Sequence, residues 1–248
     1  MTKKKSLFGD RARSIELLWQ IESSRERPNR GPKPGLSVER IAEAGVSIAD
    51  ADGLASVSMQ RVAATFGFTT MSLYRYVPSK TELVDLMIDM AMGTAPRLDR
   101  ATGWRTNLET WAGHLWGVYR MHPWLLGATV GHRVIGPNEL GWMESALAAL
   151  EGTPLDGAEK MDATFVVLGH VRNLAQQTLT TSTQEGTDEP RMLELLGELL
   201  LGRADRYPAT ARAVTSASTS ALQNQGFEFG LARILDGLGY LIGRRSYS

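Results

Sequence analysis

Gly67 separates two short helical patterns, and this arrangement constrains the fold more than any other feature of the chain. Before it, apolar residues at positions i, i+3, i+4 and i+7 predict a helix that begins after Ser58. After it, a second short helix begins near Thr69 or Thr70 and ends before Pro78, because a residue that precedes proline disfavours the α-helical region. Two short helices joined by a tight turn, with longer helices on both sides, are typical of a helix-turn-helix unit.

The longer helices beside this unit have their own boundary signals. Ser37 can cap the start of the helix before it, and Gly53 suits the left-handed position that ends that helix. The helix after the unit begins at Ser79. Asp85 and Asp89 are four residues apart on that last helix, and we expect them to lie on its solvated face.

The rest of the chain is also predicted to be helical. Six prolines after residue 95 stand near the boundaries of helical patterns, and alternating β patterns are scarce. The fold class is therefore all-α. Helices are predicted over 11–24, 104–121, 123–130, 138–150, 156–182, 189–201 and 221–242.

The composition excludes several classes of protein. The chain has no cysteine, which excludes disulfides, thiolate metal sites and cysteine nucleophiles. It has no apolar stretch of about 18 residues, and its basic start is not followed by the apolar segment of a secretory signal. We therefore expect a soluble, cytoplasmic protein without a membrane partner.

The net charge of zero hides an asymmetry between the two parts of the chain. Residues 1–80 carry 13 basic and 8 acidic side chains, whereas the remainder carries 14 basic and 19 acidic ones. This division predicts that the front part meets a polyanion. Four basic residues lie in the proline-rich stretch 25–35, which either contacts that polyanion or is a simple tether.

The second short helix has side chains suited to reading DNA. Leu73 is predicted to face the protein interior, which leaves hydroxyl-bearing and aromatic side chains for solvent or DNA. The major groove is wide enough to accept such a helix. Lys80 follows at the N-terminus of the next helix, where backbone N–H groups favour a phosphate.

The stretch from Gly67 to Lys80 resembles the signature of the TetR family of transcriptional regulators, and residues 48–67 resemble the first two helices of their DNA-binding head. The resemblance implies a homodimeric repressor that binds a palindromic operator in double-stranded DNA and is released by an unknown small-molecule effector, in the cytoplasm with the nucleoid. It also implies three parts: a basic extension over 1–35, a helix-turn-helix domain over 36–95, and a ligand-binding and dimerisation domain over 96–248.

We expect ten DNA-binding residues. The resemblance implies eight of them by position, and the other two, Thr69 and Arg75, belong to the same second short helix. Some of the ten could instead be surface residues or, for Tyr74, a core brace. The ten are Ser58, Gln60, Thr69, Thr70, Met71, Ser72, Tyr74, Arg75, Tyr76 and Lys80.

Large aromatic residues with a few polar neighbours in the body suit a pocket for a drug-sized molecule. Since the central helices of family members usually surround the effector, the resemblance implies eight candidate contacts. The alternative is that the aromatic residues among them only pack in the core. The candidates are Trp111, His114, Leu115, Tyr119, Trp124, Phe165, Gly169 and Arg172.

Three glycines in the last helix, Gly230, Gly237 and Gly239, predict a close approach to another helix, because each costs about 0.8–1.0 kcal/mol relative to alanine. We expect this helix and the one over 156–182 to form a four-helix bundle with their copies in a second subunit. The alternative is that the same faces pack within one subunit.

No catalytic, metal-binding or cofactor-binding pattern is present. The four histidines show no HExxH or i, i+4 pairing, and the chain contains no P-loop, GxGxxG or GxSxG sequence. We therefore expect no enzyme activity, no metal and no cofactor. The rival interpretation is a helical small-molecule-binding protein, or an enzyme without a known motif, that does not bind DNA.

Overall fold

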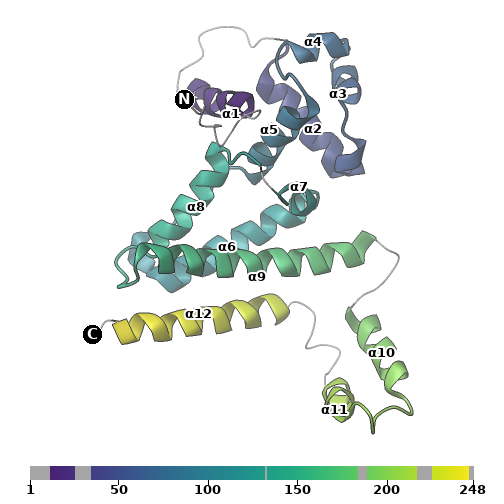
Figure 1. Ribbon diagram of the computed structural model, residues 1–248, viewed down its shortest axis with the longest axis vertical. Coiled ribbons are helices and arrows are strands. Elements are labelled where there is room, and N and C mark those ends of the chain that lie inside the picture. Colours follow the sequence, from purple (N-terminus) through teal and green to yellow (C-terminus); the bar gives the residue numbers. More distant parts are fainter. Residues whose placement is uncertain (1–11, 26–34, 132, 184–188, 217–224, 246–248) are drawn as a thin grey trace, which may run out of the picture. The chain divides into compact units, whose positions relative to one another are not determined.

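The computed structural model describes residues 12–25, 35–131, 133–183, 189–216 and 225–245, and these ranges contain helices and no strands (Figure 1). The predicted all-α fold class is confirmed for this part of the chain. Its α-helices are α1 (Ala12–Arg25), α2 (Val38–Asp52), α3 (Met59–Thr65), α4 (Thr70–Tyr74), α5 (Lys80–Met92), α6 (Trp104–Met121), α7 (Leu125–Ala128), α8 (Pro137–Ala149), α9 (Gly157–Thr183), α10 (Glu189–Leu200), α11 (Pro208–Ser216) and α12 (Gln225–Arg245).

The chain divides into two compact units, Met1–Glu151 and Gly152–Ser248. The first unit holds the helix-turn-helix helices together with α6, α7 and α8, and the second holds α9 to α12. None of the helices in the described ranges is both long enough and apolar enough to cross a bilayer.

Local capping signals fix the helices of the front part. The side chains of Ser37 and Ser58 accept hydrogen bonds from backbone amides three residues later, at 3.3 and 3.1 Å, and so begin α2 and α3. Gly53 ends α2 with a φ of 79°, and Gly67 makes the turn between α3 and α4 with a φ of 68°. Both angles lie in the left-handed region that glycine adopts at little cost.

The core of the first unit forms where α2 packs on α5. Ile41 on α2 and Leu83 and Met87 on α5 are fully buried, and each such side chain contributes about 1.5–3 kcal/mol by leaving water. Gly45 permits the close approach, because a Cβ there would collide with the Met87 side chain. The outward-facing α3 and α4 therefore rest on a rigid support.

The end of α5 is joined to α8 by hydrogen bonds between distant parts of the chain. The Asp89 carboxylate accepts the backbone amides of Asn138 at 2.9 Å and Glu139 at 3.3 Å, and so caps the N-terminus of α8. The Trp142 indole N–H donates to the carbonyls of Met92 and Gly93, both at 3.0 Å. Together these contacts fix α8 against α5.

Asp85 and Asp89 correct one expectation from the sequence. Both carboxylates are buried, so the prediction of a solvated face is wrong. Two acidic residues four positions apart are typical of an exposed helix face. In this protein that face of α5 is buried, and the Asp89 carboxylate caps the N-terminus of α8.

In the second unit α9 and α12 lie side by side and antiparallel (Figure 1). His170 Nε2 is 3.0 Å from the Phe227 carbonyl oxygen, and Arg245 near the end of α12 pairs with Glu159 near the start of α9. A Cβ on Gly230 would overlap the His170 ring. The predicted close approach at Gly230 is confirmed within one chain, while a Cβ at Gly237 would meet nothing within 4 Å.

Other boundaries differ from the expected ones. α7 is a single turn within the longer segment predicted over 123–130. α11 lies outside the predicted helices, because a proline such as Pro208 can be the first residue of a helix as well as a break between two. Of the basic extension, α1 is described, whereas 1–11 and 26–34 lie outside the described residues, as does 221–224 before α12.

Candidate nucleic-acid interface

α4 is a five-residue helix that is anchored by one side chain. Leu73 is fully buried, as predicted, and it is the residue of α4 that reaches the core. Met71 is 72% exposed and Tyr74 is 42% exposed. The Thr69 and Ser72 hydroxyls lie 3.1 Å apart, which holds the start of the helix together. This arrangement leaves the polar and aromatic side of α4 accessible.

The N-terminus of α5 adjoins α4 and presents a cation. The Ser79 hydroxyl accepts the Thr81 amide at 3.1 Å and donates to the Glu82 carboxylate, so it caps the helix. Lys80 is the first residue of α5, and its side chain is exposed. A lysine at the N-terminus of a helix is a suitable contact for a phosphate.

The ten predicted DNA-binding residues all lie on α3, α4, the N-terminus of α5 or the turns between these helices, and none of them is buried. Ser58 also caps α3, so its hydroxyl is already engaged. Phe68, which was not among the ten, is 45% exposed in the turn before α4. Its signal in the sequence was a large apolar residue directly after the turn glycine. The half-buried members are Thr70 and Ser72, and the exposed ones are Ser58, Gln60, Thr69, Met71, Tyr74, Arg75, Tyr76 and Lys80.

A second junction connects α2 to the corner between α6 and α7. Asp50 Oδ1 on α2 accepts the Trp124 indole N–H at 2.7 Å and lies 2.8 Å from His122 Nδ1. Trp124 is buried and His122 is half-buried. These contacts tie the α6–α7 corner to α2, the longer helix before the helix-turn-helix unit.

Five of the predicted effector residues lie in the first unit, four of them in its core. Trp111, Leu115, Tyr119 and Trp124 are buried, and His114 is exposed with Nδ1 2.9 Å from the Thr110 carbonyl oxygen. The Trp111 indole N–H donates to the Trp142 carbonyl at 3.0 Å, and the two indole rings meet edge to face with centroids 5.8 Å apart. The four buried residues therefore pack in the core, and contact of any of the five with an effector stays a prediction.

The other three predicted effector residues lie on α9 in the second unit. Phe165 and Gly169 are exposed, and Arg172 is half-buried. On the same helix Met161 and Val166 are exposed apolar side chains, as are Phe229 and Tyr240 on α12. Within the described residues, α9 and α12 thus both keep exposed apolar surface.

Among the described residues, no three His, Asp or Glu side chains are grouped so that they could hold a metal ion. The arrangement that remains is a short exposed helix, a capped helix N-terminus with a lysine, and a rigid support beneath them. Its shape and chemistry suit a nucleic-acid duplex.

Comparisons with known proteins identify the family of the chain. The family described as "Tetracyclin repressor-like, C-terminal domain" matches residues 95–242. The HTH-type transcriptional repressor DrrR1 of Streptomyces coeruleorubidus is 40% identical over 246 residues, which are 96% of this chain and 88% of that protein. The chain belongs to the TetR family of transcriptional regulators.

Two further relatives extend the TetR-family comparison. An HTH-type transcriptional regulator of Saccharopolyspora erythraea is 30% identical, over 72% of this chain and 75% of its own length. The crystal structure of the Streptomyces coelicolor TetR family protein ActR in complex with actinorhodin superposes with a TM-score of 0.67 at 24% identity, covering 84% of this chain and all of that one. The latter likeness concerns the fold.

Proposed function

We propose that this TetR-family protein is a repressor that binds a palindromic DNA operator as a homodimer and leaves it when a small-molecule effector binds. The observation that carries the proposal is the exposed side of α4, which is held by the buried Leu73 and adjoins Lys80. The 40% identical relative is itself named a repressor, which supports repression over activation.

Ten residues form the proposed contact with DNA. Four residues of α4 touch base edges in the major groove, since hydroxyls suit base edges and a methyl group can contact thymine. They are Thr70, Met71, Ser72 and Tyr74. Tyr76 and Lys80 bind phosphates beside the groove. Gln60 and Ser58 approach the duplex from α3, and Thr69 and Arg75 complete the surface.

The exposed apolar side chains of α9 and α12 support the dimer. Phe229 is 65% and Tyr240 is 70% exposed in one chain, and Phe165 and Val166 lie on α9. A second copy that pairs the same two helices buries these side chains in a four-helix bundle with twofold symmetry. Two copies of α4 then enter successive major grooves about 34–36 Å apart.

The effector binds in the body in this proposal. ActR, which shares the fold, has been crystallised with the small molecule actinorhodin. The eight residues expected from the sequence are the candidate effector contacts, and the Asp50 junction carries the change to α2. By linkage, DNA weakens effector binding by the same factor. The protein acts in the cytoplasm on the nucleoid, and no catalytic activity is part of this function.

The test is a titration of the purified protein against the DNA upstream of its own gene, followed by fluorescence anisotropy. We expect saturable binding that is at least 1,000-fold tighter than binding to a scrambled duplex. Ser72→Ala should relax the preference at one operator position, while Ser47→Ala, a serine on α2 away from α4, should leave the preference unchanged. Equal affinity for both duplexes would leave a helical small-molecule-binding protein as the better interpretation.

A further inference from the structure

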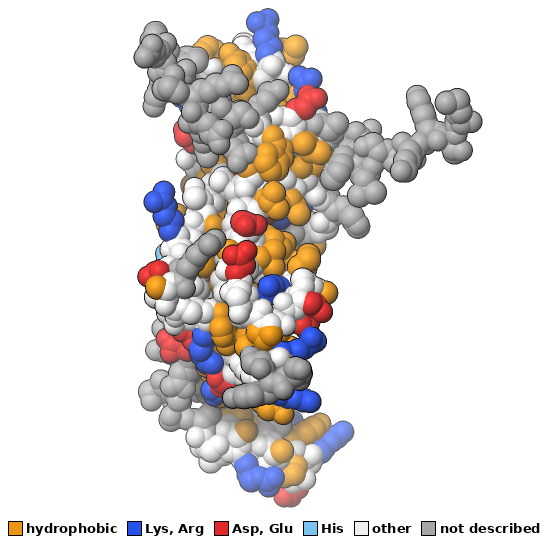
Figure 2. Space-filling model, turned by 90° about the vertical axis from the view of Figure 1, so that its left-hand side faces the viewer, with side chains coloured by type: hydrophobic (Ala, Val, Ile, Leu, Met, Phe, Trp, Pro, Cys, Tyr) orange, Lys and Arg blue, Asp and Glu red, His pale blue; other side chains and the backbone are white. Residues whose placement is uncertain are grey.

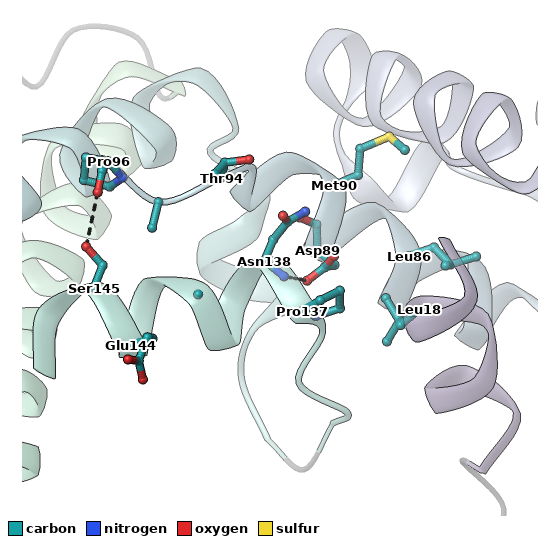
Figure 3. Close-up of a pocket in the computed structure, with 12 residues that line it drawn as sticks. Leu18, Leu86, Asp89, Met90, Thr94, Pro96, Pro137, Asn138, Glu144 and Ser145 are labelled. Atoms are coloured by element: carbon teal, nitrogen blue, oxygen red, sulfur yellow. Dashed lines mark hydrogen bonds between the residues drawn. The ribbon is translucent and has the colours of Figure 1, made fainter. Parts of the chain in front are cut away.

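A pocket of about 480 Å³ lies in the first unit between α1, α5 and α8 (Figure 3). This volume falls within the range of about 300–1,000 Å³ that is typical of small-molecule sites. None of the eight predicted effector residues lines it. The lining residues are Leu18, Leu86, Asp89, Met90, Thr94, Ala95, Pro96, Pro137, Asn138, Gly141, Glu144 and Ser145.

Hydrogen bonds between distant segments fix the walls of the pocket. The Asn138 side chain donates to the Asp89 carbonyl at 2.9 Å, in addition to the bond from its backbone to the Asp89 carboxylate. At the other end the Ser145 hydroxyl donates to the Pro96 carbonyl at 3.3 Å, as Figure 3 shows. The pocket is therefore formed before any ligand arrives, and little ordering of the protein opposes binding.

The lining is mainly apolar, and acidic residues are its only titratable members among the described residues. Leu18 on α1 and Leu86 on α5 lie side by side at one end (Figure 3), and both are almost fully buried. Asp89 is buried in the wall, and Glu144 lies exposed at the rim. An apolar lining with acidic side chains disfavours an anion and suits a neutral or cationic molecule. Elsewhere than in the close-up, Figure 2 shows hydrophobic side chains grouped on one face of the molecule with acidic ones beside them.

Gly141 leaves room in the middle of the pocket. It lies within α8, and a Cβ added there would meet nothing within 4 Å. Glycine weakens a helix interior by about 0.8–1.0 kcal/mol relative to alanine, so this position keeps the space open at a cost to the helix.

We propose that the pocket between α1, α5 and α8 is a binding site for a largely apolar small molecule that is neutral or cationic. α1, which lies before the helix-turn-helix unit in the chain, supplies one wall through Leu18. The bound molecule touches the place where Asp89 caps α8, so it contacts both helices of that joint. The proposal goes beyond DNA binding and does not depend on it.

The absence of cysteine makes a direct test possible, because one introduced thiol is then the only thiol in the protein. Gly141→Cys places a thiol in the pocket without a clash, and Gly117→Cys, at an exposed glycine of α6 that does not line the pocket, is the matched control. The probes are benzyl, trimethylammonium-ethyl and sulfonato-ethyl methanethiosulfonate. The measurement is the rate constant of each reaction in the full chain, followed by mass spectrometry.

The ratio of the benzyl rate to the sulfonate rate should be at least tenfold higher in Gly141→Cys than in Gly117→Cys. The ratio of the trimethylammonium rate to the sulfonate rate should be higher by about two- to fivefold, as expected for an exposed charge such as Glu144, and Glu144→Gln should remove this second preference. Adding Leu18→Ala should lower the benzyl preference by severalfold. Equal ratios at the two positions would overturn the proposal, and a preference for the sulfonate would overturn its assignment of ligand charge.

Discussion

The two ends of α5 differ in how far along the chain their hydrogen-bond partners lie. At its N-terminus the hydrogen bonds of Ser79 are local, and Lys80 beside it is exposed. At its C-terminus Asp89 and the Gly93 carbonyl bind groups on α8 that lie about 50 residues further along the chain. The N-terminal end therefore presents the Lys80 side chain to solvent, whereas the polar groups of the C-terminal end bind α8 and stabilise the fold. Substitutions at the two ends should separate DNA binding from stability.

Among substitutions that test the two ends of α5, Trp142→Ala should cause the largest loss in the free energy of unfolding. It removes a buried ring from the joint and leaves the Met92 and Gly93 carbonyls without the indole N–H. We expect a loss of about 3–5 kcal/mol in the free energy of unfolding, measured by urea denaturation at fixed protein concentration. Met143→Ala, at the half-buried neighbouring position, should cost much less, and an equal loss for both would contradict the role given to Trp142.

Leu73→Ala tests whether the exposed DNA-binding surface of α4 depends on the buried side chain that anchors this helix. Removing this fully buried side chain should cost about 2–5 kcal/mol and abolish tight operator binding, because α4 loses its anchor. Urea denaturation and anisotropy measure the two effects. The control is Leu140→Ala on α8, where the leucine is 48% exposed and the change should stay within about 0.5 kcal/mol. Operator binding at the level of the unmodified protein would show that α4 does not need Leu73.

Asp89→Ala should destabilise the protein by about 1–3 kcal/mol, because the amides of Asn138 and Glu139 lose their acceptor. Hydrogen exchange at the first turn of α8 should become faster, while exchange in α2 stays the same. Asp162→Ala, at an exposed aspartate of α9, should change neither quantity. Unchanged exchange in α8 would mean that the cap contributes nothing.

Lys80→Ala should have the smallest effect on stability, within about 0.5 kcal/mol, because the side chain is exposed. It should weaken binding to every duplex by a similar factor and reduce the slope of log affinity against log salt by about one. Titrations at several salt concentrations measure this slope, and Lys160→Ala on α9 should leave it unchanged. An unaltered slope for Lys80→Ala would argue against a phosphate contact.

The helix-turn-helix unit could be predicted from the sequence because its signals are local. Ser37, Ser58 and Ser79 each act on an amide two or three residues away, and Gly67 sets its own turn. The burial of Leu73 followed from the helical period alone.

The joint at the other end of α5 could not be predicted in this way. Asp89 accepts a hydrogen bond from Asn138, which is 49 residues away, and no sequence pattern near either residue predicts this contact. The aromatic residues of α6 were recognised as apolar, but the burial of Trp111 against Trp142 depends on how α6 meets α8. The pocket beside α1 depends in the same way on three helices from separate parts of the chain.

Gly136, the residue before α8, lies so close to Asp89 that a Cβ there would occupy the space of the carboxylate. A change at either position alone should destabilise the protein. A larger residue at 136 displaces the Asp89 carboxylate, and a smaller residue at 89 removes the N-terminal cap of α8. Over evolutionary time the two sites should therefore be inherited as a pair, and homologues that lack one partner should lack the other as well.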